Sequence, residues 1–309
     1  MILTITLNPS VDISYKLDKL SINTINRVDD PPKTAGGKGL NVARVLHQLD
    51  VDVAAAGFLG GSLGQFIRSE VSTLGIQDFF VDITGSTRNC IAVIHEGKQT
   101  EILESGPRIT EKEAVIFVDA FTKQIEEVDI ITISGSLPKG LPNDYYAKLI
   151  SIAAQQDVPV LLDTGGSLMV TTLANGPKPF LIKPNEEELA DVIGKEIKQE
   201  SEIKEALSLQ MLENIPWIVV TLGNKGAIVK HNGTIYKANI PTINAVNPVG
   251  SGDSVVAGFA AGFSKELDDE SIIKYGLTMG ILNALEEKTG YINSNNINSI
   301  MSQIEVQEI

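Results

Sequence analysis

Residues 247–254 read NPVGSGDS and combine a turn, two glycines and an acidic residue. An apolar run over 255–263 follows directly, which predicts a closely packed helix that begins near Ser251. The start of a helix presents unpaired N–H groups and the positive end of its dipole, and glycines let a phosphate approach those groups closely. The chemistry that such an arrangement could perform is phosphoryl transfer, with the N–H groups as an anion hole.

Asp253 stands in the first turn of this predicted helix. A carboxylate would repel a phosphate, so it is better suited to accept the proton of a hydroxyl that attacks the phosphoryl group. The alternative is structural, because Asp is common at helix N-termini and glycines shape the turns before them. The stretch by itself favours the structural interpretation, since short motifs often match by chance.

Clusters of glycine, hydroxyl and charged residues follow four other predicted strands. They are residues 134–138 (SGSLP), 163–166 (DTGG), 183–188 (KPNEEE) and 221–226 (TLGNKG). In an open parallel sheet, ligands bind at the carboxyl ends of the strands. Each cluster alone could be ordinary turn chemistry, but their recurrence predicts a long crevice for a ligand that carries phosphates.

Asn185 and Glu188 have two interpretations. Asn at the N-cap with Glu three residues later is a capping box, which the spacing favours. The functional alternative is a carboxylate that orders hydrated Mg²⁺ beside nucleotide phosphates. Both hold if Glu187 or Glu188 points into the crevice.

Basic residues in loops and strands are the candidates for binding an anionic substrate. Lys38, Arg27 and Arg88 could hold a phosphate, which Arg binds through two hydrogen bonds, or could be solvated surface charges. Asp12 lies on the polar face of an alternating segment and could accept hydrogen bonds from sugar hydroxyls, or could also be solvated.

The 309-residue chain carries a net charge of −14, which argues against nucleic acid and anionic membranes as partners. Its one cysteine, Cys90, excludes an internal disulfide. We expect a cytoplasmic protein, because the N-terminus lacks a signal-peptide pattern and no apolar run approaches membrane-spanning length. Neither a P-loop nor a dinucleotide fingerprint is present.

The apolar periodicity predicts an α/β fold with a parallel sheet covered by helices on both faces. The strands expected in this sheet are 2–7, 51–58, 129–133, 158–162, 179–183 and 216–221, with a hairpin over 227–237. The helices expected outside the opening motif are 40–49, 62–74 (capped by Ser62), 110–127, 269–287 and 294–304, and only helices are expected after 254. The alternating segments 11–17 and 88–104 predict a small second sheet at one edge.

Three motifs resemble those of the ribokinase-like sugar kinases, also called the PfkB family. GGKGLNVA at 36–43 resembles the first signature and NPVGSGDS the second, and Asn185-x-x-Glu188 resembles the magnesium-associated motif. The resemblance covers the whole chain in order. It implies a three-layer α/β/α fold with a mostly parallel central sheet, formed as one kinase domain over 1–309. It also implies lid strands inserted at about 11–35 and 86–105, and a homodimer through that lid sheet.

The resemblance implies ATP-dependent phosphoryl transfer to a sugar hydroxyl. Asp253 would be the base, and the anion hole would be formed by Gly250, Ser251 and Gly252. The residues expected to hold the sugar phosphate are Asp12, Arg27 (from its own or a neighbouring subunit), Gly36, Gly37, Lys38, Asn41, Arg88 and Ser136. Those expected at the ATP site are Lys183, Asn185, Thr221, Gly223, Gly226 and Asn283, with Glu188 organising Mg²⁺ through water.

Residues 6–12 (TLNPSVD), 87–90 (TRNC) and the second signature most resemble the branch of the family that acts on ketohexose phosphates. This resemblance implies conversion of D-tagatose 6-phosphate to D-tagatose 1,6-bisphosphate, with conversion of fructose 1-phosphate to fructose 1,6-bisphosphate as the alternative. The motifs place phosphate-binding residues without showing which end of the sugar they hold. A rival of another class is a non-catalytic sugar-phosphate or nucleotide sensor, which would have no need of a base such as Asp253.

Overall fold

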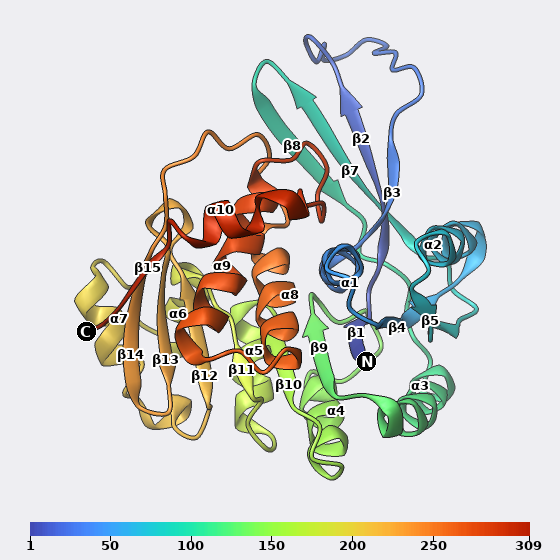
Figure 1. Ribbon diagram of the computed structural model, residues 1–309. Helices are drawn as coiled ribbons and strands as arrows, with labels where there is room; N and C mark the ends of the chain where they lie inside the picture. Colours follow the sequence, from blue (N-terminus) through green and yellow to red (C-terminus); the bar gives the residue numbers. More distant parts are fainter.

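The computed structural model describes residues 1–309. A large sheet crosses the molecule in the order β15-β14-β13-β12-β11-β10-β9-β1-β4-β5, with β6 also paired to β4 (Figure 1). The strands from β12 to β5 are mutually parallel, and β12 to β15 continue the sheet as antiparallel neighbours. The strands are β1 (Ile2–Thr6), β4 (Val53–Leu59), β5 (Gln77–Asp78), β6 (Val81–Asp82), β9 (Ile130–Ser134), β10 (Val160–Asp163), β11 (Leu181–Ile182), β12 (Trp217–Thr221), β13 (Ala227–His231), β14 (Thr234–Asn239) and β15 (Glu305–Glu308).

Alternate side chains of the strands pack into two separate cores, which makes three layers. Ile2 points to one core and Leu3 to the other, as the twofold period of a strand requires. The helices over the first core are α1 (Lys38–Gln48), α2 (Gly61–Thr73), α8 (Ser251–Ser264), α9 (Asp269–Ala284) and α10 (Ile297–Met301). Those over the second are α3 (Glu111–Gln124), α4 (Tyr145–Ala154), α5 (Gly166–Ala174), α6 (Glu186–Ile193) and α7 (Glu200–Ala206). The predicted ribokinase-like α/β fold is thereby confirmed.

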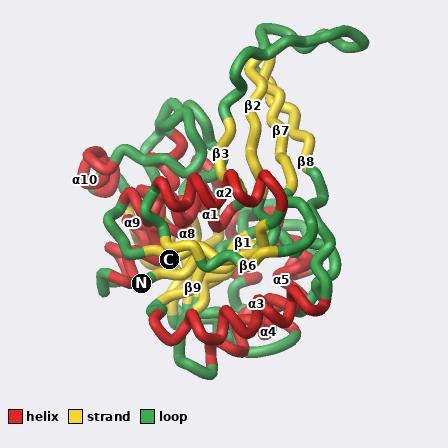
Figure 2. The backbone as a smooth tube through the Cα atoms, turned by 90° about the vertical axis from the view of Figure 1, so that its right-hand side faces the viewer, coloured by secondary structure: helices red, strands yellow, loops and turns green.

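A second, four-stranded sheet stands away from the layers (Figure 2). Its strands, in spatial order, are β3 (Lys33–Gly36), β2 (Ser10–Lys16), β7 (Arg88–His95) and β8 (Lys98–Leu103). β1 leads almost directly into β2, and β3 leads into α1, so the small sheet is anchored beside the carboxyl end of β1. This position lets both sheets contribute side chains to one site.

Two local predictions were wrong. Ser62 does not cap α2, because the N-cap is Gly60 and no side chain caps this helix. A side chain at Gly60 would collide with the Gly85 carbonyl oxygen at 1.9 Å, so the close turn depends on glycine. Residues 305–308 form β15, whereas only helices were expected after 254. This short polar strand has no apolar alternation and exists because it pairs with β14.

The capping boxes at Thr110 and Asn185 are confirmed, and the structure places a strand or helix at each of the other segments named above. No helix is both long and apolar enough to cross a membrane.

Candidate active site

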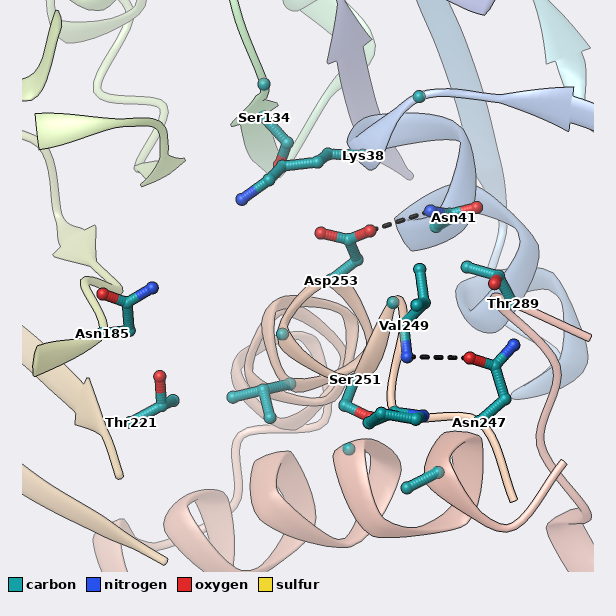
Figure 3. Close-up of a pocket in the computed structure, with 18 of the residues that line it drawn as sticks. Lys38, Asn41, Ser134, Asn185, Thr221, Asn247, Val249, Ser251, Asp253 and Thr289 are labelled. Carbon is teal, nitrogen blue, oxygen red and sulfur yellow. Dashed lines mark hydrogen bonds between the residues drawn. The ribbon is translucent and has the colours of Figure 1, made fainter. Parts of the chain in front are cut away.

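A cleft of about 2010 Å³ lies where the carboxyl ends of the parallel strands face the small sheet. It is lined by both signature motifs and by all four strand-end clusters. The long crevice expected from the recurrence of those clusters is therefore present. Figure 3 shows how side chains from α1, α8 and the strand ends converge on it.

The N-terminus of α8 opens into this cleft. Gly250 is its N-cap residue, with a φ of 82°, in the left-handed region that favours glycine. A side chain there would lie 2.4 Å from Thr289 Cγ2. Gly250 and Gly252 have no side chains to cover their N–H groups, which are accessible to an anion, whereas Ser251 N donates to Pro248 O at 3.2 Å.

Asp253 follows in the same turn and is only 6% exposed. Burial, the largest influence, raises the pKa of this carboxyl to about 6, although Lys38 and a hydrogen bond from Asn41 favour its charged form. Asn41 Nδ2 donates to Asp253 Oδ2 at 2.8 Å, which leaves Oδ1 directed toward the cleft (Figure 3). A carboxylate with one oxygen held and one free is suited to accept a proton.

The loop before α8 is held by amide side chains. Val249 N donates to Asn247 Oδ1 at 3.0 Å, and Asn283 Nδ2 donates to Val249 O at 2.9 Å. Asn283 Oδ1 also accepts from Gly290 N at 2.7 Å. Asn283 is fully buried and does not line the cleft, so it shapes the loop and the neighbouring turn instead of lining the site.

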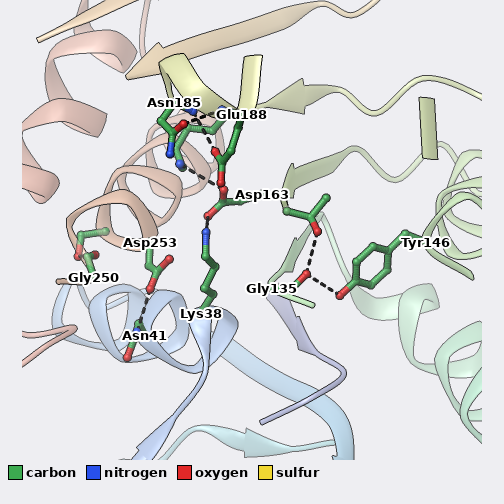
Figure 4. A network of polar contacts seen from close by, with 12 residues as sticks. Lys38, Asn41, Gly135, Tyr146, Asp163, Asn185, Glu188, Gly250 and Asp253 are labelled. Atoms are coloured by element: carbon green, nitrogen blue, oxygen red, sulfur yellow. Dashed lines mark hydrogen bonds and ion pairs between the residues drawn. The ribbon is translucent and has the colours of Figure 1, made fainter. Parts of the chain in front are cut away.

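Asp163, at the end of β10, joins two lysines beneath the cleft (Figure 4). Its Oδ2 lies 3.2 Å from Lys38 Nζ and its Oδ1 lies 3.2 Å from Lys183 Nζ. The carboxylate is fully buried, and the two ammonium groups outweigh that burial and lower its pKa. Asp163 in turn raises the pKa of Lys38, so the lysine keeps its charge. The result is a fixed pair of cations beside Asp253.

The small sheet supplies a second polar wall. Asp12 Oδ1 accepts a 2.6 Å hydrogen bond from Ser10 Oγ, and burial raises the Asp12 pKa. A side chain at Gly36 would lie 2.1 Å from Asp12 Cγ, so glycine is needed for this packing although Gly36 itself does not line the cleft. Arg88 donates to the carbonyl oxygens of Asn8 and Glu104, which fixes its guanidinium and leaves other N–H groups for a ligand.

Arg27 is not brought to the site by its own chain. It is exposed in the long loop between β2 and β3 and does not line the cleft. Of the remaining predicted residues, those lining the cleft are Gly37, Lys38, Asn41, Ser136, Lys183, Asn185, Glu188, Thr221, Gly223, Gly226 and residues 250–253.

Glu188 and Asn185 form a capping box, with hydrogen bonds of 2.9 and 2.8 Å, and both also line the cleft. No group of three acidic, His or Cys side chains is arranged to hold a metal.

Across the cleft, the Gly223–Gly226 turn contains two glycines with positive φ. At Gly226 a side chain would lie 2.0 Å from Ala238 O. This wall is a backbone surface suited to a flat or phosphate-bearing ligand.

Two structurally central residues had no predicted role, namely Asp163 and Arg44. Asp163 was named only as part of a turn cluster, and its signal was an acid that directly ends a buried strand. Arg44 follows Asn41 by three positions and precedes Gln48 by four, in a helix whose other central residues, from 40 to 46, are apolar. That spacing puts them on one helical face, which could have marked a buried polar stripe.

The three layers, the small sheet and an acid at the start of α8 define a ribokinase-like carbohydrate kinase. The pfkB carbohydrate kinase family matches residues 5–296, so the chain belongs to this family. Such enzymes are phosphotransferases with an alcohol acceptor and use ATP as phosphoryl donor.

Three solved structures show the same likeness over nearly the whole chain. A candidate phosphofructokinase from Staphylococcus aureus is 32% identical, with 100% of this chain and 99% of that chain covered and a TM-score of 0.85. Phosphofructokinase-2 from Escherichia coli, in complex with potassium, is 26% identical, with 97% and 98% covered and a TM-score of 0.90. A proposed 1-phosphofructokinase from Thermotoga maritima is 26% identical, with 100% and 99% covered and a TM-score of 0.90.

Proposed function

We propose that this kinase phosphorylates a ketohexose phosphate, with D-tagatose 6-phosphate as the preferred acceptor and D-tagatose 1,6-bisphosphate as product. The observation that carries the proposal is the position of Asp253. It lies buried at an open helix N-terminus, with one free oxygen and with Lys38 nearby. The choice of sugar depends on the motifs at 6–12 and 87–90, which resemble those of the branch acting on ketohexose phosphates.

In the proposed reaction, Asp253 orients the acceptor hydroxyl and accepts its proton as the new O–P bond forms and the bond from the γ-phosphorus of ATP to the ADP oxygen breaks, which releases ADP. A carboxyl with a pKa of about 6 is ionised at neutral pH and is a better base than an ordinary aspartate. The N–H groups of Gly250 and Gly252, that of Ser251 once it leaves Pro248 O, and the ammonium of Lys38 neutralise charge on the transferred group. In a loose transition state, positioning and charge neutralisation supply most of the rate.

The acceptor would lie between Asp12 and Arg88 of the small sheet, with Arg88 and Lys38 on its phosphate. The free N–H groups of Arg88 match a phosphate, because a guanidinium can bind two of its oxygens at once. Asp12 is an acceptor suited to sugar hydroxyls. This arrangement fits a substrate that carries both a phosphate and several hydroxyl groups.

The donor side fits ATP, because Lys183 and the α8 N-terminus present positive charge to phosphates and the Gly223–Gly226 turn is close to bare backbone. Mg²⁺ would be held mainly by phosphate oxygens and water, with Glu188 as the nearby carboxylate. When bound, the ion would neutralise phosphate charge. Its only expected contact with this chain is through water to Glu188.

Fructose 1-phosphate is the alternative acceptor, and the proposed 1-phosphofructokinase among the similar structures favours it. A coupled assay should compare kcat/KM for D-tagatose 6-phosphate, fructose 6-phosphate and fructose 1-phosphate. We expect the first to be highest. A higher value for either other sugar would reassign the substrate, and no ADP formation with any of them would favour the sensor.

We also propose a homodimer in which the small sheets of two copies pack together and Arg27 serves its neighbour's cleft. β8 is exposed along its whole length, and its Ile102 and Leu103 are 57% and 59% exposed. Ile102→Glu should produce monomers in light scattering, whereas Val115→Glu, on the exposed part of α3, should not. A monomeric wild-type protein would contradict the proposal.

A further inference from the structure

Arg44 is a buried cation that pairs with no carboxylate. It lies in the middle of α1 and is 5% exposed. Its guanidinium donates to three uncharged oxygens, which are Asn41 Oδ1 at 3.0 Å, Thr289 O at 3.0 Å and Ala35 O. Removing a charge from water without a counter-ion is costly. The position therefore calls for a reason beyond ordinary packing.

Asn41 lies between this cation and Asp253. Its amide oxygen accepts from Arg44 Nη1, and its amide nitrogen donates to Asp253 Oδ2 at 2.8 Å. If the amide were flipped, its NH₂ group would face the guanidinium N–H and its oxygen would face the carboxylate. Both contacts would be repulsive, because donor would meet donor and acceptor would meet acceptor. Arg44 thus selects one of two amide orientations.

We propose that Arg44 is a positioning residue for phosphoryl transfer, which orients the Asn41 amide so that it holds Asp253 Oδ2 and leaves Oδ1 free for the acceptor proton. This inference rests on the proposed function, in which Asp253 is the base. The positive charge behind the amide also polarises it and strengthens its donor side. The guanidinium makes no hydrogen bond to Asp253, so its hydrogen-bonded route to that carboxylate runs through Asn41, while its charge also favours ionised Asp253 through space.

The chain of hydrogen bonds from Arg44 through Asn41 should affect the titration of Asp253. The other charged groups that act on this carboxyl are Lys38, Asp163 and Lys183, from α1 and the ends of β10 and β11. The hydrogen bond from Asn41 favours the ionised form. When Asn41 is no longer oriented, this stabilisation is lost and the remaining burial should raise the pKa of the base further.

A purely structural role is the competing explanation, because α1 also holds the segment 289–292. Gln48 provides the matched control. Its amide donates to Gly290 O at 2.9 Å and accepts from Ile292 N at 3.0 Å, without touching Asn41. Gln48→Ala should loosen the same segment as Arg44→Met while leaving the Asn41 amide oriented.

The experiment measures kcat/KM against pH, from 5 to 9, for the wild type, Arg44→Met and Gln48→Ala with the best ketohexose phosphate. We expect Arg44→Met to lower kcat at neutral pH by about 10- to 100-fold and to shift the acid limb upward by about 0.5–1 pH unit. KM for ATP should change by less than about threefold, because the nucleotide wall is untouched. Gln48→Ala should keep the wild-type acid limb.

A double-mutant cycle with Asn41→Ala tests whether Arg44 shifts the acid limb through the Asn41 amide. If Arg44 acts mainly through the amide, Arg44→Met should shift the acid limb much less in the Asn41→Ala background than in the wild type, because only the through-space effect of the charge remains. Arg44→Lys keeps the charge without the guanidinium fork and should show a smaller shift. If circular dichroism shows that Arg44→Met is unfolded, Arg44→Lys replaces it in the comparison.

Equal acid limbs in Arg44→Met and Gln48→Ala, or additive shifts in the double variant, would overturn the positioning role. Failure of the wild type to form ADP would instead overturn the proposed function, and with it this inference. The two failures are distinguishable because the first leaves an active wild-type kinase.

Discussion

Asn41 donates a 2.8 Å hydrogen bond to the buried carboxylate of Asp253, although 212 positions separate the two residues. The bond joins the first helix of the chain to the helix that carries the second signature motif. It holds one carboxylate oxygen and orients the other toward the cleft, as a general base requires.

Asp253→Asn should abolish turnover and leave binding intact. The amide keeps the shape of the carboxyl but cannot accept the proton, so we expect kcat to fall by at least about 10³-fold. ATP affinity should change by less than about threefold, because the N–H groups at the start of α8 are unaffected. Single-turnover kinetics and calorimetric titration would test this, and a variant with near-wild-type kcat would exclude Asp253 as the base.

The pH dependence of catalysis should report the raised pKa of Asp253. Because the base is active only when ionised, kcat/KM should fall about tenfold per pH unit below a pH of about 6. An acid limb near the ordinary value of 3.8 would show that burial does not control this group. The measurement uses saturating ATP and a mixed buffer of constant ionic strength.

Stability should depend on pH through the same carboxyl. Its folded pKa, about 6, lies above the unfolded value of 3.8, so the folded state binds the proton more tightly. The contribution of this protonation to folding stability is complete below the unfolded-state pKa and is lost as pH rises through the folded-state pKa. Wild type should therefore lose stability relative to Asp253→Asn between about pH 4 and 6.5. Parallel urea unfolding curves across this range would contradict the expectation.

Asp163→Asn should destabilise the fold. The substitution leaves the buried Lys183 ammonium without its counter-ion, which typically costs about 3–5 kcal/mol of unfolding free energy. Adding Lys183→Met to Asp163→Asn should recover part of the loss, because no unpaired buried cation remains. Urea denaturation measures both effects.

The control for the Asp163 prediction is an exposed ion pair. Glu270→Gln removes the surface contact with Lys274 and should change stability by less than about 0.5 kcal/mol. A similar loss in both variants would mean that the buried position of Asp163 has no special importance.

Gly36→Ala should weaken acceptor binding selectively. The added methyl group would lie about 2.1 Å from Asp12 Cγ and must displace that carboxyl. We expect KM for the sugar phosphate to rise by at least about tenfold, equivalent to the loss of a charge-assisted hydrogen bond, with KM for ATP unchanged. Gly262→Ala is the control, because its methyl group would make only ordinary contacts of 3.4 Å and more near the end of α8. Equal KM values in the two variants would refute the role of Asp12.

Much of the fold could be predicted because it depends on local patterns. The capping boxes at Thr110 and Asn185 and the helix start near Ser251 follow from short segments whose neighbours in sequence are also their partners in space. The parallel strands have distant partners, but each shows as a short apolar run between helical patterns. β15 could not be predicted, since its four residues form a strand only by pairing with β14.

The amino-acid sequence by itself determined which chemical groups are available, namely an acid at a glycine-shaped helix start, a lysine after Gly37 and an arginine that begins the strand at 88–95. Only the tertiary structure decided which of them meet. It placed Asp163 between two lysines, directed Asn41 toward Asp253 and left Arg27 outside the cleft. The physical reason is that burial and pairwise contact act over a few ångströms of space, whatever the separation along the chain.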